Sequence, residues 1–297
     1  MQLWDIRSSR SLARIPLQTY GKSVEWQTNG NSNLLVITER DNSVHVHDVR
    51  RLKNQSANVS AGSSNSQNSN ANSSQVKMFQ FQDIVADTHF SPSGTHLISA
   101  AKRMNDGMGV IHLYPLETPS TTPIENSDNI INGKGKHSSE TFEKITTVGH
   151  TGNIFAMKFS PDGKKLATGG NDALVGLWNV QSLTCTATIS RRTKFIRSVA
   201  FSFDSKIVAC CSQEKNIDIA DASTGELVGE LSLAKTNERD RDIRNSRGGG
   251  KAGFGMTVGA DEIAFHPKAH LIACARGESI TGPVPQVTIA KLHYTRS

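Results

Sequence analysis

The sequence predicts an all-β fold assembled from repeated antiparallel meanders, and three observations support this prediction. In residues 149–180, GHTGNIFAMKFSPDGKKLATGGNDALVGLWNV, short alternating strands are separated by turn signals. An aromatic residue followed by a turn of the F-S-P-D-G kind recurs at 26–30, 90–94, 159–163, 201–205 and 265–269. The pair that ends the third strand, Trp178-Asn179 in this stretch, has counterparts at 4–5, 47–48, 114–115, 220–221 and 290–291. Such repetition predicts several copies of one supersecondary unit.

Four residues in this stretch, His150, Thr168, Asp172 and Trp178, predict a structural hydrogen-bond network within one meander. The turn aspartate accepts from a histidine in the preceding loop, and the histidine leads on to the threonine hydroxyl and then to the indole N–H. The network satisfies polar groups that the sheet would otherwise bury unpaired. With its Gly-His start, the stretch resembles the WD-repeat blade of a β-propeller, with Asn179 in place of the final Asp. A catalytic His-Asp pair is disfavoured, because the threonine and the tryptophan are in register with it.

Taken in order, the chain predicts about five and a half blades of a WD-repeat β-propeller. Met1 falls within a strand, so residues 1–17 supply the last two strands of a blade. Four complete meanders follow, and the final blade has three strands. No N-terminal strand is left over to complete that blade and remove its edge. We therefore expect an incomplete seven-blade ring that lacks about one and a half blades.

The domain prediction is a single propeller, 1–297, with loop insertions at about 51–74, 117–139 and 234–257. The first insertion is rich in Ser, Asn and Gln, which bury too little apolar surface to offset the entropy of ordering. We expect it to be a disordered loop.

The composition predicts a protein without membrane spans or secretion. Apolar residues make up 36% of the chain, and no run of about 18 of them and no basic-then-apolar leader occurs. The four cysteines, Cys185, Cys210, Cys211 and Cys274, show no CxxC spacing and lie in predicted strands. We expect buried thiols in a reducing compartment.

No residue pattern indicates catalysis, a metal or a cofactor. The sequence contains no G-x-S-x-G, no H-E-x-x-H and no phosphate-binding loop. His45 and His47 share a strand face, but no neighbouring Cys or carboxylate set completes a metal site. His47-Asp48 is better interpreted as a degenerate W-D pair. We therefore expect no enzyme activity and no small-molecule substrate.

Two loops contain many of the basic residues of a chain whose net charge is +6. Arg191, Arg192 and Lys194 lie in one loop, and Arg244 and Arg247 lie in the other. Both loops join a fourth strand to the next first strand, so a propeller would place them on one rim. A basic rim suits RNA or an acidic partner, and these residues are the candidate contacts. The alternative is a solvated surface, because no aromatic residues are interleaved for base stacking.

Several stretches resemble subunit 3 of the THO complex, most clearly in the C-terminal half. They are N-D-A-L-V-G-L-W-N-V at 171–180, F-I-R-S-V-A-F-S at 195–202, I-D-I-A-D at 217–221 and A-F-H-P at 264–267. The long Asn/Ser loop and the missing first blade depart from that family. The resemblance implies a nuclear, non-catalytic scaffold of a THO/TREX-like complex, which couples transcription to mRNP assembly and mRNA export. Its implied partners are the large helical THO subunits.

A different function is indicated by Trp4-Asp5-Ile6-Arg7, which satisfies the W-D-x-R pattern. WD-repeat substrate receptors of cullin-RING ubiquitin ligases dock on their adaptor through this pattern, although it also arises often in WD repeats generally. Direct RNA binding by the basic rim is a third reading and is compatible with the scaffold.

Overall fold

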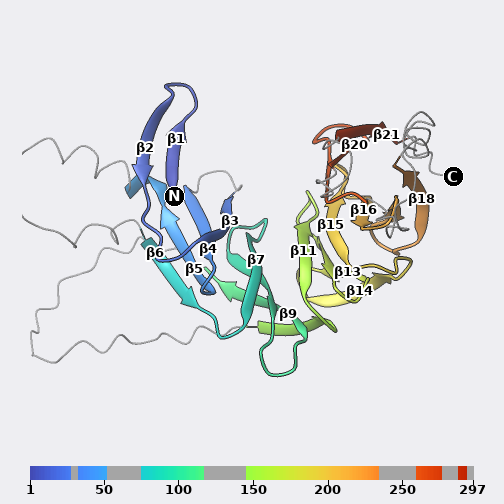
Figure 1. Cartoon of the computed structure of the whole chain (residues 1–297), viewed down its shortest axis with the longest axis horizontal. Coiled ribbons are helices and arrows are strands. Elements are labelled where there is room, and N and C mark those ends of the chain that lie inside the picture. Colours follow the sequence, from blue (N-terminus) through green and yellow to red (C-terminus); the bar gives the residue numbers. More distant parts are fainter. Residues whose placement is uncertain (28–32, 52–74, 117–144, 234–258, 276–286, 293–297) are drawn as a thin grey trace, which may run out of the picture. The chain divides into compact units, whose positions relative to one another are not determined.

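The computed structural model describes residues 1–27, 33–51, 75–116, 145–233, 259–275 and 287–292 and is built from β-strands (Figure 1). A two-stranded sheet contains β1 (Gln2–Asp5) and β2 (Arg10–Arg14). The next sheet contains β3 (Gly21–Trp26), β4 (Leu34–Glu39), β5 (Ser43–Asp48) and β6 (Gln75–Gln80). A third contains β7 (Ile84–Phe90), β8 (His96–Lys102), β9 (Gly109–Pro115) and β10 (Ile145–His150).

Three further sheets complete the described strands. They are β11 (Ile154–Phe159), β12 (Lys165–Gly170), β13 (Val175–Asn179) and β14 (Thr184–Ile189); β15 (Ile196–Phe201), β16 (Ile207–Ser212), β17 (Asn216–Asp221) and β18 (Leu227–Ser232); and β19 (Glu262–Phe265), β20 (Leu271–Ala275) and β21 (Val287–Lys291). Neighbouring strands in every sheet follow chain order. The predicted series of half a blade, four complete meanders and a three-stranded blade is confirmed.

The strands fall into two compact units. The first holds β1 to β6, the second holds β11 to β21, and the sheet β7–β10 contributes residues to both. The predicted insertions at about 51–74, 117–139 and 234–257 lie outside the described residues, apart from Arg51. Among the described residues, no helix has the length and apolar character needed to cross a membrane.

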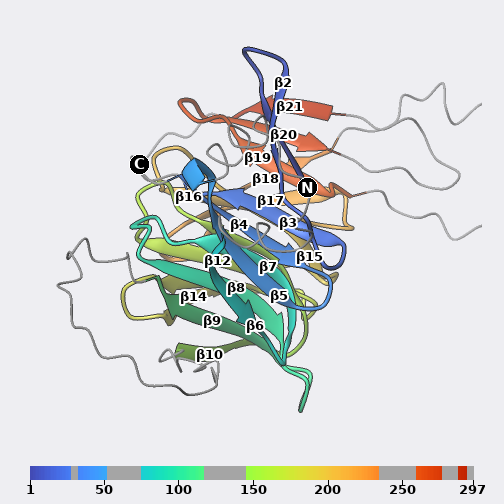
Figure 2. The ribbon, with the colours of Figure 1, turned by 90° about the vertical axis from the view of Figure 1, so that its left-hand side faces the viewer.

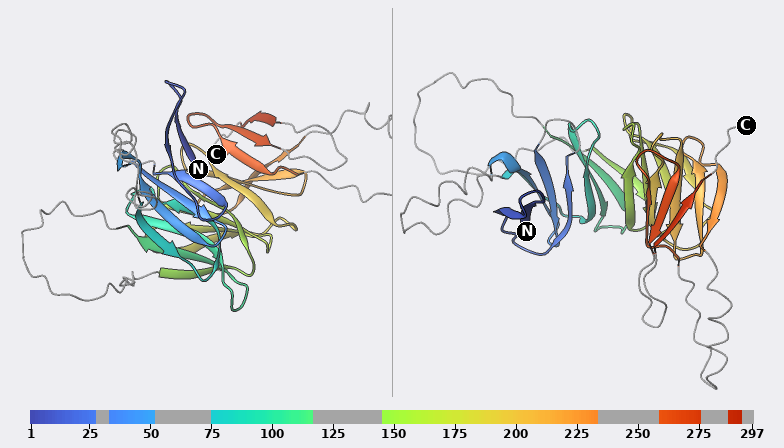
Figure 3. Two further views of the ribbon diagram at one scale, coloured as in Figure 1. Left: turned by 60° about the vertical axis from the view of Figure 1, so that its left-hand side comes forward. Right: turned by 90° about the horizontal axis from the view of Figure 1, so that it is seen from above.

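Successive sheets of the second unit pack through their first strands. β15 contacts β11 and β12, and β19 contacts β15 and β16; the sheets can be followed from yellow-green to red in Figures 2 and 3. The core between β11–β14 and β15–β18 is apolar and includes Val175, Leu177, Val199 and Val208. Gly169 permits this close approach, because a Cβ there would overlap Ile196 Cγ2. This is how blades that each have one apolar face bury it against a neighbour.

The fourth strands are the solvent-facing edges of their meanders, and this corrects one prediction. Cys210, Cys211 and Cys274 are buried as expected, but Cys185 on β14 is exposed. The reason is that β14 pairs with β13 on one side only, so that much of the strand faces outward. Burial raises the pKa of the Cys210 thiol to about 12. That thiol is therefore not a nucleophile at neutral pH.

Candidate functional site

The structure brings His150, Thr168, Asp172 and Trp178 together in the predicted order. Nδ1 of His150 lies 2.9 and 3.1 Å from the two carboxylate oxygens of Asp172, and Nε2 lies 2.8 Å from Thr168 Oγ1. The indole Nε1 of Trp178 donates to the same hydroxyl at 2.9 Å. His150 closes β10 rather than lying in a loop, so the network joins the end of one sheet to the next.

The directions of donation along this network follow from the groups at its two ends. The carboxylate only accepts, so Nδ1 of His150 carries a proton, and the indole only donates, so the Thr168 oxygen accepts from it. The threonine O–H is then free to donate to Nε2 of His150. Burial acts to raise the pKa of Asp172, but hydrogen bonds from His150 and from the Thr151 N–H hold that pKa below its usual value. Every member is hydrogen-bonded, so the network holds the blade together.

Two glycines make room for the network. A Cβ on Gly170 would overlap the imidazole of His150, and a Cβ on Gly176 would lie 2.7 Å from the indole Nε1 of Trp178. A sheet with a larger residue at either glycine position cannot hold the same four-residue network and must bury other polar side chains there. The sheets β3–β6 and β15–β18 have such residues.

Register makes the sheets comparable position by position. The first strands β3, β11 and β15 have a register shift at the same place, between Gly21 and Ser23, Ile154 and Ala156, and Ile196 and Ser198. Trp178, Ala220 and His47 pair with equivalent residues of the second strands, which are Leu166, Val208 and Leu35. In β15–β18 the counterparts of His150, Thr168, Asp172, Gly176 and Trp178 are Arg192, Cys210, Glu214, Asp218 and Ala220. In β3–β6 the counterparts of Gly170, Gly176 and Trp178 are Glu39, His45 and His47.

The sheet β15–β18 replaces the neutral network with an ion-pair cluster. Arg192 Nη1 donates to Glu214 at 3.0 Å, and its Nη2 donates to Asp218 and, at 2.6 Å, to Glu230. Arg191 Nε donates to the second oxygen of Asp218 at 3.1 Å. The Asp218 side chain is fully buried and that of Arg192 is 7% exposed. Because Ala220 leaves the volume that an indole would fill, the carboxylate of Asp218 can enter it.

This cluster changes the interpretation of the basic loop. Burial acts to lower the pKa of Arg192, but hydrogen bonds to Asp218 and to two glutamates raise that pKa above its ordinary value. The structure therefore pairs Arg192, and in part Arg191, within the blade. A contact of this loop with RNA or an acidic partner stays a prediction. Lys194 is exposed, whereas Arg244 and Arg247 lie outside the described residues.

A threonine clamp on an acidic side chain is common to the three sheets. The backbone N–H and the hydroxyl of Thr193 donate to Glu214, and those of Thr19 donate to Glu39. The Thr151 N–H donates to Asp172 at 3.0 Å, and its hydroxyl makes a longer contact of 3.5 Å with the same oxygen. We call these three pairs the acid–threonine clamps. They attach the segment before each first strand to its own sheet.

In β3–β6 two buried histidines lie next to the clamp. The rings of His45 and His47 are stacked with centroids 6.2 Å apart. Burial, and then the charge of His45, lowers the pKa of His47 from 6.5 to about 4. Within the described parts of the chain, no group of three or more His, Cys, Asp or Glu side chains could hold a metal ion. Because the register places His45 and His47 at the positions of Gly176 and Trp178, the pair is part of the rebuilt network.

The lowered pKa of His47 predicts how stability depends on pH. Between pH 4 and 6.5 the unfolded chain binds more protons at this site than the folded one, so stability falls as pH drops through this window. His47 alone contributes up to about 3 kcal/mol to this loss. We expect the His47→Gln variant to show a shallower fall than the parent protein when urea unfolding is measured at pH 7 and pH 4. Parallel curves for the two proteins would contradict the shift.

The W-D-x-R residues lie at the start of the first unit. Trp4 ends up 59% exposed in β1, and Arg7 lies in the turn that follows, where its backbone N–H donates to Asp5 Oδ1 at 2.9 Å. The exposed indole contrasts with the buried indole of Trp178, because β1 has one partner strand, β2.

Comparison with known proteins agrees with this architecture. The family model "WD domain, G-beta repeat" matches residues 142–179 and 183–219. WD repeat-containing protein AAC3 of Dictyostelium discoideum is 25% identical over 69% of this chain and 34% of its own length. THO complex subunit 3 of Arabidopsis thaliana is 20% identical over 78% of this chain and 58% of its own length. The chain thus spans about one third and about three fifths of these two relatives.

A solved structure shares the fold. A chain in a crystal structure of the mitotic checkpoint complex superposes with a TM-score of 0.65 at 17% identity, covering 98% of this chain and 70% of that one. At this identity the likeness concerns the fold alone. Residues 142–179 and 183–219 thus carry WD repeats, and the four-stranded meanders together with the structural likeness show a WD-repeat β-propeller fold.

Proposed function

We propose that the protein is a non-catalytic scaffold subunit of a THO/TREX-like complex in the nucleus, which couples transcription to mRNP assembly and mRNA export. The observation that carries this proposal is the similarity to the Arabidopsis THO complex subunit 3 along 78% of the chain. The polar clusters of β11–β14 and β15–β18 support it, because their acids and bases are paired within the blades. The chemistry left to such a rigid sheet protein is recognition through its surface.

The proposed partners are the other THO/TREX subunits. Exposed Lys194, two residues before β15 in the second unit, offers a positive contact to RNA or to an acidic partner surface. A single lysine contributes little to RNA affinity, since nonspecific binding grows with the number of phosphates neutralised. We therefore expect protein contacts to hold the complex together and RNA to be an accessory.

Affinity purification from nuclear extract tests the proposal. The tagged protein is recovered with and without RNase and its partners are identified by mass spectrometry. The expected result is recovery of the large THO subunits in both samples, unchanged in an Arg7→Ala variant. Recovery of a cullin and its adaptor that is lost in Arg7→Ala would instead establish the ubiquitin-ligase receptor. Loss of every partner after RNase would overturn the protein-held scaffold.

A further inference from the structure

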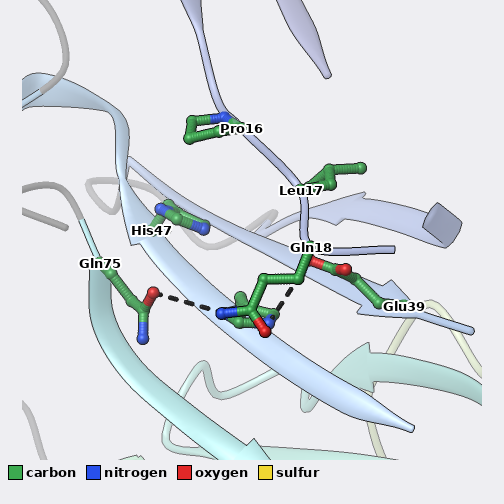
Figure 4. Close-up of a pocket in the computed structure, with 7 residues that line it drawn as sticks. Pro16, Leu17, Gln18, Glu39, His47 and Gln75 are labelled. Carbon is green, nitrogen blue, oxygen red and sulfur yellow. Dashed lines mark hydrogen bonds and ion pairs between the residues drawn. The ribbon is translucent and has the colours of Figure 1, made fainter. Parts of the chain in front are cut away.

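A pocket of about 210 Å³ lies in the first unit at the network position of β3–β6. It is lined by residues 16–18 and by Glu39, His45, His47 and Gln75 (Figure 4). Pockets that hold drug-sized molecules are larger, roughly 300–1,000 Å³. This space suits one side chain or a group of similar size.

The pocket results from two substitutions in the rebuilt network. The imidazole of His47 takes the register position of Trp178 and is smaller than an indole. Leu17 stands at the same distance before its first strand as His150 and Arg192 stand before theirs. The sheets β11–β14 and β15–β18 thus bring a basic side chain to this position, whereas β3–β6 brings an apolar one.

Acceptor oxygens define the polar side of the pocket. Oε2 of Glu39 accepts from the Thr19 N–H at 2.6 Å and from the Thr19 hydroxyl at 3.0 Å. Ser43 gives its hydroxyl proton to Asp41 at 2.7 Å, so Nε2 of His45, 3.0 Å from Ser43 Oγ, must donate to Ser43. Nε2 of His45 is 3.5 Å from Glu39 Oε1, beyond an ordinary hydrogen bond.

Gln75 adds a second acceptor beside Glu39. Its Oε1 lies 3.4 Å from His45 Nδ1, again a long contact, so both oxygens keep capacity to accept from a donor in the pocket. The stacked rings of His45 and His47 provide a flat aromatic surface next to these oxygens. His47 stays neutral at physiological pH because burial lowers its pKa to about 4, so that ring does not repel a cation.

The acids of the three acid–threonine clamps differ in their basic partners, and Glu39 lacks a close one. His150 lies 2.9 Å from Asp172, and Arg192 lies 3.0 Å from Glu214. Glu39 has a side chain only 2% exposed, and its ion-pair partner, His45, is 3.5 Å away. A buried carboxylate is stabilised by a close, hydrogen-bonded cation.

We propose that this pocket binds the guanidinium of an arginine side chain presented by a partner protein. The guanidinium has five N–H donors and no acceptor, which matches the two acceptor oxygens, and its plane can stack on the histidine rings. The arginine from outside then does for Glu39 what Arg192 does for Glu214 within the chain. This assignment holds whichever complex the protein joins.

The test uses the full chain and Nα-acetyl-arginine-N-methylamide, with the citrulline analogue as an uncharged probe of the same shape. Binding is followed by NMR on the imidazole resonances of His45 and His47. We expect saturable shifts with the arginine probe and at least tenfold weaker binding of citrulline. Glu39→Gln, which keeps an acceptor for Thr19, should weaken arginine binding at least tenfold, whereas the exposed Glu226→Gln should not change it.

A second variant keeps the proposal testable if Glu39→Gln fails to fold. Leu17→Arg places a guanidinium of the chain's own at the position that Arg192 occupies before β15, and it should abolish binding of the probe while thermal unfolding remains cooperative. Equal binding of citrulline and arginine, unchanged binding in Leu17→Arg, or no shift with the arginine probe at tens of millimolar would each overturn the proposal.

Discussion

Replacing Arg192 with methionine should lower the free energy of unfolding by about 3–5 kcal/mol, the cost of removing one partner from a buried ion pair. Methionine retains much of the apolar stem, so the main loss is the charge that faces Asp218. That carboxylate is fully buried, and in the variant only Arg191, whose side chain is 30% exposed, remains next to it. Urea unfolding followed by circular dichroism gives the change.

Two further variants separate this explanation from a packing effect. Arg191→Met should cost much less, because Asp218 keeps Arg192. Adding Asp218→Gly to Arg192→Met should recover part of the loss, because it removes the unpaired charge and restores the glycine present at this position in β11–β14. A loss below about 1 kcal/mol in Arg192→Met, or no recovery in the double variant, would show that the cluster does not stabilise the blade as described.

Thr168→Val should lower the free energy of unfolding by about 2–4 kcal/mol, because it leaves two buried groups without a partner at about 1–3 kcal/mol each. Those groups are the indole N–H of Trp178 and Nε2 of His150. The exposed Thr188→Val on β14 is the matched control and should change stability by less than about 0.5 kcal/mol.

Coupling between the members of this network can be measured directly. His150→Leu and Thr168→Val should be non-additive in a double-mutant cycle, since each removes the same hydrogen bond. Additive effects would mean that the two side chains stabilise the blade independently, which contradicts the observed 2.8 Å contact.

The network of β11–β14 could be predicted from sequence because all four of its residues are of the types that the pattern requires. The repeat pattern does not predict the ion-pair cluster of β15–β18, although one residue of the sequence indicates it. Asp218 interrupts the apolar strand residues Ile217 and Ile219, and a buried charge demands a partner. Arg192 was instead assigned to a surface contact, because its carboxylate partners lie far along the chain and the register alone brings them together.

The pocket beside Glu39 could not be predicted from the sequence either, because it too depends on the register of the strands. His47-Asp48 was interpreted as a degenerate W-D pair, and the register agrees with this. Nothing in the chain order indicates that Glu39 takes the position of Gly170, because the first hairpin of β3–β6 is longer than that of β11–β14. The volume left by a smaller ring depends on packing, which only the structure shows.

The three tryptophans allow the buried network to be tested in one spectrum. Trp4 is 59% and Trp26 is 48% exposed, whereas Trp178 is 4% exposed and donates its indole N–H to Thr168. In a nitrogen–proton correlation spectrum of the full chain, we expect one indole N–H signal to persist after transfer to D₂O, and that signal to lose its protection in Thr168→Val. If all three signals exchanged at the same fast rate, the network on which the comparison of the blades rests would not exist.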